Sequence, residues 1–271
     1  MSNLLKHMWF ELRHNPVFWV TLTVCFTFML FLTGTVVMSF STDPSVPTSA
    51  ACDWLNLFKN SATEGILPLI TISGTSVVLM FGQKFSSRTI NQEITAGHSR
   101  GEIFASLCIV GFVVLSSTVL LSVIAGCLCW AGKFPMPSAE IAIPYFLRIL
   151  FLLPILSFSF FSACMIFVVC FRDTAKATVF SACFLFTAVI LMAVTLTAIL
   201  KPYLAATPGA FGSVVSAPPL SLFLQPTFLI WYVLYSTLTP AQGIQAAGVA
   251  IGWTALFLSI AYCVFRRCEL K

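Results

Sequence analysis

The chain has 271 residues, of which 59% are hydrophobic and only 8% charged, and its mean hydropathy is +0.98. Soluble domains usually carry about 25% charged residues, so this composition excludes a soluble protein. Apolar runs near the length of one helical membrane crossing recur along the chain, whereas the alternating segments of a β-barrel are not visible. We therefore predict an all-α, polytopic membrane protein in which residues 1–271 form a single transmembrane domain.

The first predicted element is a short amphipathic helix over residues 3–15. Four apolar residues share one face by their helical spacing: Leu5, Met8, Trp9 and Leu12. We expect this helix to lie in the inner membrane interface as an elbow before the first span, with Trp9 at the depth of the headgroups and Arg13 in the polar layer.

Six apolar stretches then predict six membrane spans: residues 17–40, 66–81, 103–130, 145–171, 178–200 and 244–265. Residues 41–65 are rich in Ser, Thr, Pro and acidic residues and are expected to form an outer loop. The outer loop 201–243 contains a further apolar stretch, 220–238, which is long enough to cross the bilayer. This stretch is either a re-entrant helical hairpin or a seventh span.

The positions of the cations favour six spans. Six crossings place ten of the fourteen cations on the inner side: Lys6, Arg13, Lys84, Arg88, Arg100, Arg172, Lys176, Arg266, Arg267 and Lys271. A seventh crossing would put Arg266 and Arg267 outside, against the positive-inside rule. We therefore interpret 220–238 as re-entrant and expect cytoplasmic N- and C-termini. Cations in short patches at span ends do not indicate nucleic-acid binding.

Between the second and third spans lies a polar segment, residues 83–102, which concentrates charge in a chain that has little. Gly97 is suited to end a helix in the left-handed conformation. Ser99 can cap the next helix, with Glu102 completing a capping box. Ile90 and Ile94 would share one face for docking, with Arg88 and Arg100 at its rim. These features predict a rigid, bent connection between the two spans.

The chemistry of an enzyme is missing from the sequence. All three histidines lie in polar segments, no Asp or Glu lies at mid-bilayer, and there is no His-Glu-x-x-His metal motif or phosphate-binding loop. We expect no catalytic residue and no metal site on this chain. Most of the ten cysteines lie in apolar runs and are interpreted as small buried hydrophobes. Whether Cys52 forms a disulfide stays open.

Three places resemble the permease subunit of type-two ABC exporters, the family of bacitracin and lantibiotic immunity permeases. They are the N-terminal segment from Asn3 to Trp19, the stretch from Thr89 to Phe104, and the ending Phe265-Arg266-Arg267-Cys268-Glu269-Leu270. With six spans, the resemblance covers essentially the whole chain. The sequence departs from the family pattern at Lys84, where an acid is common, at Arg88, where Gly is common, and at Asn91, where a basic residue is common.

The resemblance implies a mechanism and a set of partners. Two copies of a cytosolic ABC ATPase would bind ATP and Mg, so this chain itself would carry no cofactor. It would pair with a second permease copy or a paralogue and export a hydrophobic or amphipathic solute, such as a peptide antibiotic or a lipid-like compound, from a bacterial plasma membrane. The implied ATPase-coupling residues are Arg88, Thr89, Ile90, Glu93, Ile94, Gly97, Ser99, Arg100 and Glu102, and the implied elbow residues are Trp9 and Arg13. The alternative is a stand-alone secondary carrier or channel of six spans.

Overall fold

The computed structural model describes residues 2–42, 54–130, 139–195, 226–235 and 240–267. Every regular element within these ranges is an α-helix, as predicted. The helices are α1 (Ser2–His14), α2 (Pro16–Thr42), α3 (Trp54–Ser86), α4 (Thr89–Thr95), α5 (Arg100–Trp130), α6 (Ala139–Phe171), α7 (Thr174–Thr195), α11 (Pro226–Tyr235) and α12 (Pro240–Arg267). This outcome follows from the apolar composition, because a backbone in hydrocarbon must satisfy its own hydrogen bonds.

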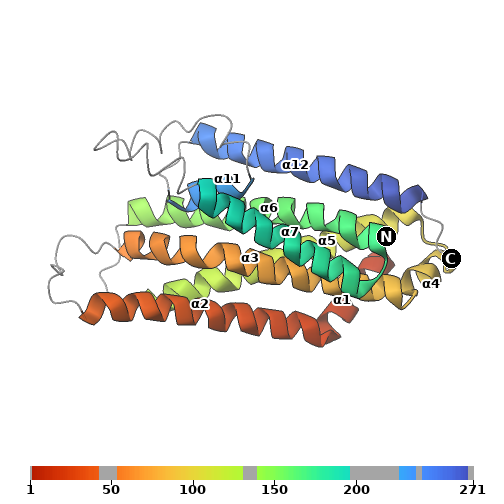
Figure 1. The fold of residues 1–271 in the computed structure, drawn as a ribbon, viewed down its shortest axis with the longest axis horizontal. Coiled ribbons are helices and arrows are strands. Elements are labelled where there is room, and N and C mark those ends of the chain that lie inside the picture. Colours follow the sequence, from red (N-terminus) through yellow and green to blue (C-terminus); the bar gives the residue numbers. More distant parts are fainter. Residues whose placement is uncertain (1, 43–53, 131–138, 196–225, 236–239, 268–271) are drawn as a thin grey trace.

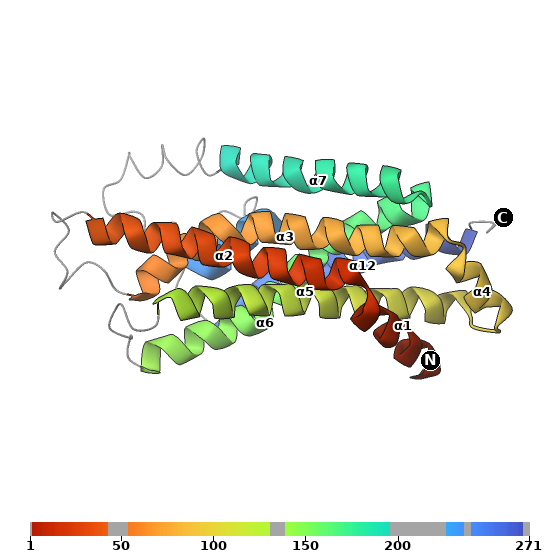
Figure 2. The same ribbon diagram turned by 90° about the horizontal axis from the view of Figure 1, so that it is seen from below.

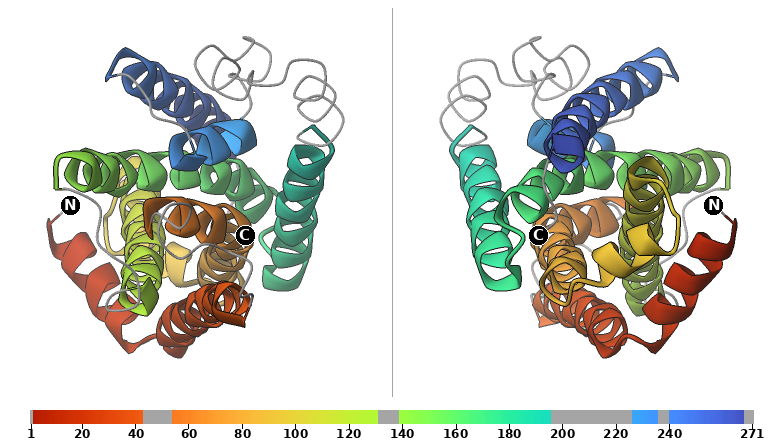
Figure 3. Two further views of the ribbon diagram at one scale, coloured as in Figure 1. Left: turned by 90° about the vertical axis from the view of Figure 1, so that its left-hand side faces the viewer. Right: turned by 90° about the vertical axis from the view of Figure 1, so that its right-hand side faces the viewer.

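Five of these helices are long and apolar enough to cross a membrane: α2, α5, α6, α7 and α12. The prediction of a polytopic helical membrane protein is confirmed at this level. The long helices lie side by side in an elongated bundle (Figures 1 and 2), in which α6 packs on α12, α3 on α7, and α2 on α5. Seen end-on, α3 lies inside the bundle while α7 and α12 lie at its edge (Figure 3).

The predicted outer loop, 41–65, is partly helical, and the helix that contains the predicted second span, 66–81, is longer than that span. Helix α2 continues to Thr42, and α3 already begins at Trp54 and continues to Ser86 with Pro68 in its interior. Residues 54–64 contain no Pro or Gly, so nothing in the local backbone prevents a helix there. Their polar side chains made the stretch resemble a loop. Among the residues whose side chains the structure describes, α3 does not provide one of the five apolar spans.

The predicted outer loop 201–243 lies largely outside the described residues, and residues 240–243 already belong to α12. The described part of its predicted re-entrant stretch, 220–238, is α11, a helix of ten residues. At 1.5 Å per residue it is about 15 Å long, roughly half the thickness of the hydrocarbon core. It packs against α6, α3, α7 and α12, and Phe228, Leu229, Ile230, Tyr232 and Val233 are fully or almost fully buried.

The described cysteines only partly follow the sequence interpretation. Cys25 and Cys164 are buried and Cys108 and Cys127 are half-buried, whereas Cys170, Cys183 and Cys263 are exposed on the sides of helices. All seven are free thiols. Cys52 lies outside the described residues.

Helix α5 is tightly surrounded at Gly111. A Cβ atom at this position would lie 2.6 Å from Cε1 of Phe161 and 3.3 Å from Phe81. Both rings are almost completely buried and pack edge to face, with centroids 5.8 Å apart, so neither can move aside easily.

We therefore expect Gly111→Ala to destabilise the bundle by about 1–3 kcal/mol through overpacking. The midpoint of thermal unfolding of the detergent-solubilised protein measures this loss. Gly248→Ala is the matched control, because nothing lies within 4 Å of a Cβ atom there. Equal midpoints for the two variants would contradict the close crossing.

Candidate functional site

One end of the bundle gathers the polar parts of the chain. Helix α1, helix α4 and the C-terminal end of α12 lie there together (Figures 1 and 2). The turn between α6 and α7 is also there, because Thr174 Oγ1 lies 3.0 Å from Ser86 Oγ at the end of α3. Among the cations whose side chains the structure describes, all except Arg148 are at this end: Lys6, Arg13, Lys84, Arg88, Arg100, Arg172, Lys176, Arg266 and Arg267. This clustering agrees with the distribution from which the inner side was predicted.

The polar segment 83–102 forms a short helix between two tight junctions. Helix α3 ends at Ser86, and Arg88 adopts the left-handed conformation with φ 57° before α4 begins. Left-handed backbone favours glycine, so an arginine here adopts a conformation that few side chains tolerate. Next to it, the hydroxyl oxygens of Ser87 and Thr89 lie 2.7 Å apart.

The predicted glycine cap of α4 is confirmed. Gly97 has φ 92°, its N–H donates to the carbonyl of Ile94 at 3.0 Å, and the N–H of His98 donates to the carbonyl of Glu93 at 3.2 Å. These two bonds form a Schellman motif, which satisfies the last carbonyls of the helix and fixes the direction of the outgoing chain.

The predicted capping box at the start of α5 is also confirmed. The Ser99 N–H donates to Oε2 of Glu102 at 3.1 Å, and the Glu102 N–H donates to Oγ of Ser99 at 3.3 Å. The Ser99 hydroxyl donates to the same carboxylate oxygen at 3.1 Å. Because the cap of α4 and the box of α5 follow each other directly, only a few residues connect the two helices, and their backbone N–H groups are bonded.

The predicted docking face of α4 is wrong. Ile90 is only 1% exposed and Ile94 is half-buried, and both pack against the bundle. The face that points away from the bundle carries Gln92, Thr95 and Ala96, which are exposed. The spacing of the two isoleucines correctly placed them on one side of α4, but that side faces inward.

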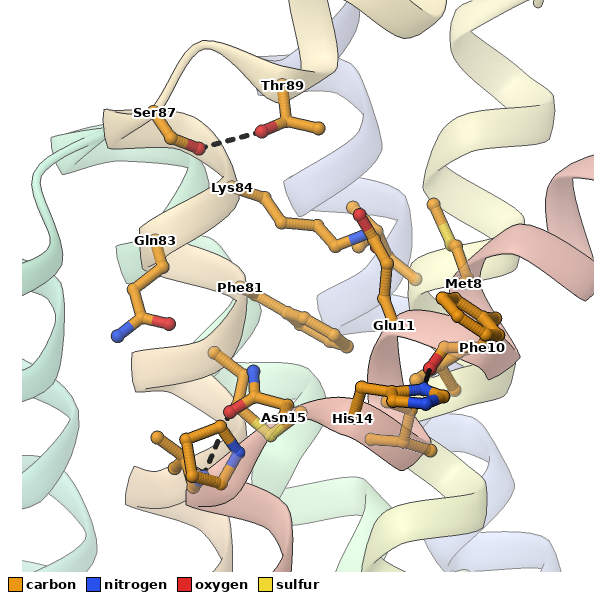
Figure 4. A pocket seen from close by; sticks show the side chains of 16 residues that line it. Met8, Phe10, Glu11, His14, Asn15, Phe81, Gln83, Lys84, Ser87 and Thr89 are labelled. Carbon is orange, nitrogen blue, oxygen red and sulfur yellow. Dashed lines mark hydrogen bonds and ion pairs between the residues drawn. The ribbon is translucent and has the colours of Figure 1, made fainter.

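A carboxylate–lysine cluster, formed by Glu11, Lys84 and Glu93, holds α4 and α1 to the end of α3. The Lys84 ammonium donates to Oε2 of Glu11 in a close ion pair and lies 3.9 Å from Oε1 of Glu93. Lys84 and Glu11 point toward each other across a groove (Figure 4). The sequence did not suggest this cluster, because Glu11 and Lys84 are 73 positions apart.

Glu93 is the most buried member of the cluster. Its side chain is 8% exposed, compared with 18% for Lys84 and 35% for Glu11. Desolvation raises the pKa of Glu93 above the ordinary value of 4.5, and the nearby Lys84 ammonium opposes this shift only in part. Within the described part of the chain, neither carboxylate oxygen of Glu93 has a hydrogen-bond partner.

Arg100 connects the start of α5 to the end of α12. One of its guanidinium nitrogens, Nη1, donates to the backbone carbonyl of Arg266 at 2.8 Å. This carbonyl belongs to the last turn of α12, where the negative end of the helix dipole favours a cation. The residue before Arg266 is Phe265, whose ring packs against Phe85 of α3 and Phe104 of α5, with centroid distances of 6.0 and 5.8 Å.

The predicted N-terminal helix is present as α1, but its buried face is rotated relative to the prediction. Leu4, Met8 and Leu12 are buried, whereas Trp9 is 54% exposed and Arg13 is exposed. Trp19 of α2 donates from Nε1 to the Arg13 carbonyl at 2.7 Å, which fixes the angle between the two helices. The exposed Trp9 is free of the core, as an interfacial anchor requires.

A groove of about 510 Å³ lies between α1, the end of α3 and α5. One part of its wall is apolar, with Met8, Phe81 and Val110, and another is polar, with Glu11 and Lys84 (Figure 4). The groove lies between α1 and the rest of the bundle, on the side where Lys84 contacts Glu11.

No protein-family model matches the chain, and no curated protein sequence matches it significantly. A function must therefore be inferred from the geometry of this end of the bundle together with the sequence pattern.

The capping box generates a direct prediction. Ser99→Ala removes the side-chain acceptor of the Glu102 N–H and should loosen the first turn of α5 by about 1 kcal/mol. Hydrogen exchange of the amides at residues 102 and 103 in the full-length protein measures the change. Ser116→Ala is the control, since its hydroxyl only donates to the Phe112 carbonyl within α5. Unchanged protection in Ser99→Ala would show that the box does not hold the junction.

Proposed function

We propose that this chain is the transmembrane permease subunit of an ATP-driven ABC exporter. The observation that carries the proposal is α4 with its surroundings. This short helix stands beyond the ends of the spans, is capped rigidly toward α5, and is connected to α1 and α3 by Lys84. Such an arrangement suits an element that receives a mechanical load from a separate protein.

The contacts define a path for that load. A partner would press on the outward face of α4 at Gln92, Thr95 and Ala96. The buried Ile90 and the Glu93 carboxylate would pass the displacement to α3, and the Gly97–Ser99 junction would pass it to α5. Arg100 would then move the end of α12 through the Arg266 carbonyl, so that several spans respond together.

In the proposed topology, α3 is a sixth crossing. Its 33 residues span about 50 Å, more than the hydrocarbon thickness, so its polar ends can leave the bilayer. The stretch 220–238, which includes α11, is re-entrant and lies toward the outer side. The cation-rich end of the bundle is cytoplasmic, which places both termini and the polar segment there.

The proposed assembly contains two copies of a cytosolic ABC ATPase, which bind ATP and Mg, and a second permease copy or paralogue. This chain has no catalytic role. The transported solute is hydrophobic or amphipathic, such as a peptide antibiotic or a lipid-like compound, and leaves through the plasma membrane of a bacterium.

The proposal predicts two uncoupling variants. Gly97→Val forces a β-branched residue into a left-handed backbone, which costs roughly 1–2 kcal/mol and should displace α4. Arg100→Glu places an anion beside the carbonyl end of α12, which is unfavourable by about 1 kcal/mol or more. Both should lower the amount of solute transported per ATP hydrolysed in proteoliposomes that contain the whole transporter.

Two control variants separate these effects from the mere change of a residue. Lys176→Glu reverses an exposed charge at the same end of the bundle, and Gly97→Asn keeps a residue that tolerates left-handed backbone. Lys176→Glu should retain more coupling than Arg100→Glu, and Gly97→Asn should retain more than Gly97→Val. If all four variants transport as much solute per ATP as the parent protein, α4 is not the coupling element.

The partner itself provides the test of the proposed class. The tagged chain, co-expressed with its neighbouring genes and purified in mild detergent, should bring down an ABC ATPase whose hydrolysis depends on the permease. A chain that transports solute in proteoliposomes without any ATPase is instead the stand-alone carrier or channel.

A further inference from the structure

The cluster at the end of α3 contains two carboxylates and a single lysine. Lys84 makes its close ion pair with Glu11, while Glu93 lies at the longer distance of 3.9 Å. One ammonium compensates one negative charge, so the second carboxylate is not neutralised by it. Of the two, Glu11 is the better solvated, at 35% exposed against 8% for Glu93. The uncompensated charge therefore falls on the group that is most costly to bury.

The surroundings of Glu93 offer little other compensation. Two histidines, His7 of α1 and His98 after α4, act on it only at a distance, and His7 lies 3.8 Å from Glu11 instead. No described group donates a hydrogen bond to either Glu93 oxygen. Burial in this position favours the protonated carboxyl more than water does.

We propose that Glu93 binds a proton when α4 is packed against the bundle and releases it when α4 moves away. Glu93 is thus a conformation-linked proton site at the joint between the polar segment and the spans. The site consists only of described residues of this chain. The proposal can therefore be tested whether or not the chain is an ABC exporter subunit.

The sign of the pH dependence follows from the raised pKa of Glu93 in the packed state. When α4 is displaced, the carboxyl is exposed to water and returns toward the ordinary value of 4.5. The packed state therefore holds more protons between these two pKa values. Packing of α4 is fully favoured below pH 4.5, weakens as the pH rises to the raised pKa of Glu93, and changes no further above it.

Hydrogen exchange of the intact protein in lipid nanodiscs, without any ATPase, tests the proposal. The reporters are the amides of Ala96, Gly97 and His98, which are bonded to carbonyls of α4. After correction for the intrinsic pH dependence of exchange, their opening constant should rise between pH 4.5 and 8. One released proton gives at most about a tenfold rise per pH unit.

Three variants sharpen the result. Glu93→Gln cannot lose a proton, so its opening constant should not change with pH. Glu11→Gln removes the carboxylate that competes for Lys84. The ammonium then stabilises only the Glu93 carboxylate, so the rise in the opening constant should move to lower pH. Asp173→Asn is the control, because this exposed carboxylate caps α7 and lies outside the cluster, so the pH dependence at the reporters should stay as in the parent.

A pH-independent opening constant in the parent protein would overturn the proposal, and so would a shift to higher pH in Glu11→Gln. The infrared spectrum gives a second measurement that needs no stable Glu93 variant. The carbonyl band of a protonated carboxylic acid should persist in the parent above pH 4.5 and disappear at lower pH in Glu11→Gln. A band that titrates identically in both proteins would also contradict the site.

Discussion

The contacts of Lys84 hold the polar end of this bundle together. A single ammonium group at the end of α3 faces Glu11 from α1 and Glu93 from α4, so three elements depend on one charge. Removing a partner from a half-buried pair leaves the remaining charge uncompensated, a larger penalty than the pair's own contribution to stability. The position of α4, and with it the connection between α3 and α5, therefore depends on whether this charge balance is kept.

The rest of the molecule places this cluster at a boundary. The bodies of the long helices are apolar because a backbone in hydrocarbon is satisfied only within helices, and their side chains must match the lipid. Charges therefore accumulate where the spans end, and among the cations whose side chains the structure describes, all except Arg148 lie together with α1, α4 and the end of α12. A small displacement of α4 acts on that boundary through Ile90, Glu93 and Arg100. This arrangement is suited to coupling, whether the load comes from an ATPase or from proton binding.

The parts of the fold that the sequence predicted are those with local causes. Apolar length predicted the helical spans, and Gly97, Ser99 and Glu102 predicted both caps of the junction because each cap needs residues at fixed offsets in the chain. The start of α3 was missed because polar side chains in residues 54–64 resemble a loop although their backbone is free to be helical. The inward rotation of Ile90 and the pairing of Glu11 with Lys84 could not be predicted, since both depend on how distant helices pack. Glu93 belongs to the polar segment by its place in the sequence, but its burial is a tertiary effect.

The most direct measurement of the central claim is the side of the membrane on which α4 lies. Thr95 is exposed on the outward face of α4, so Thr95→Cys presents a thiol to whichever compartment that face contacts. A membrane-impermeant maleimide is applied to right-side-out cells and to inverted vesicles, with the parent chain giving the background of its own ten cysteines. The account predicts labelling above background only in the inverted vesicles. Labelling of intact cells would place α4 outside the cytosol and would contradict an ATP-driven role for this segment.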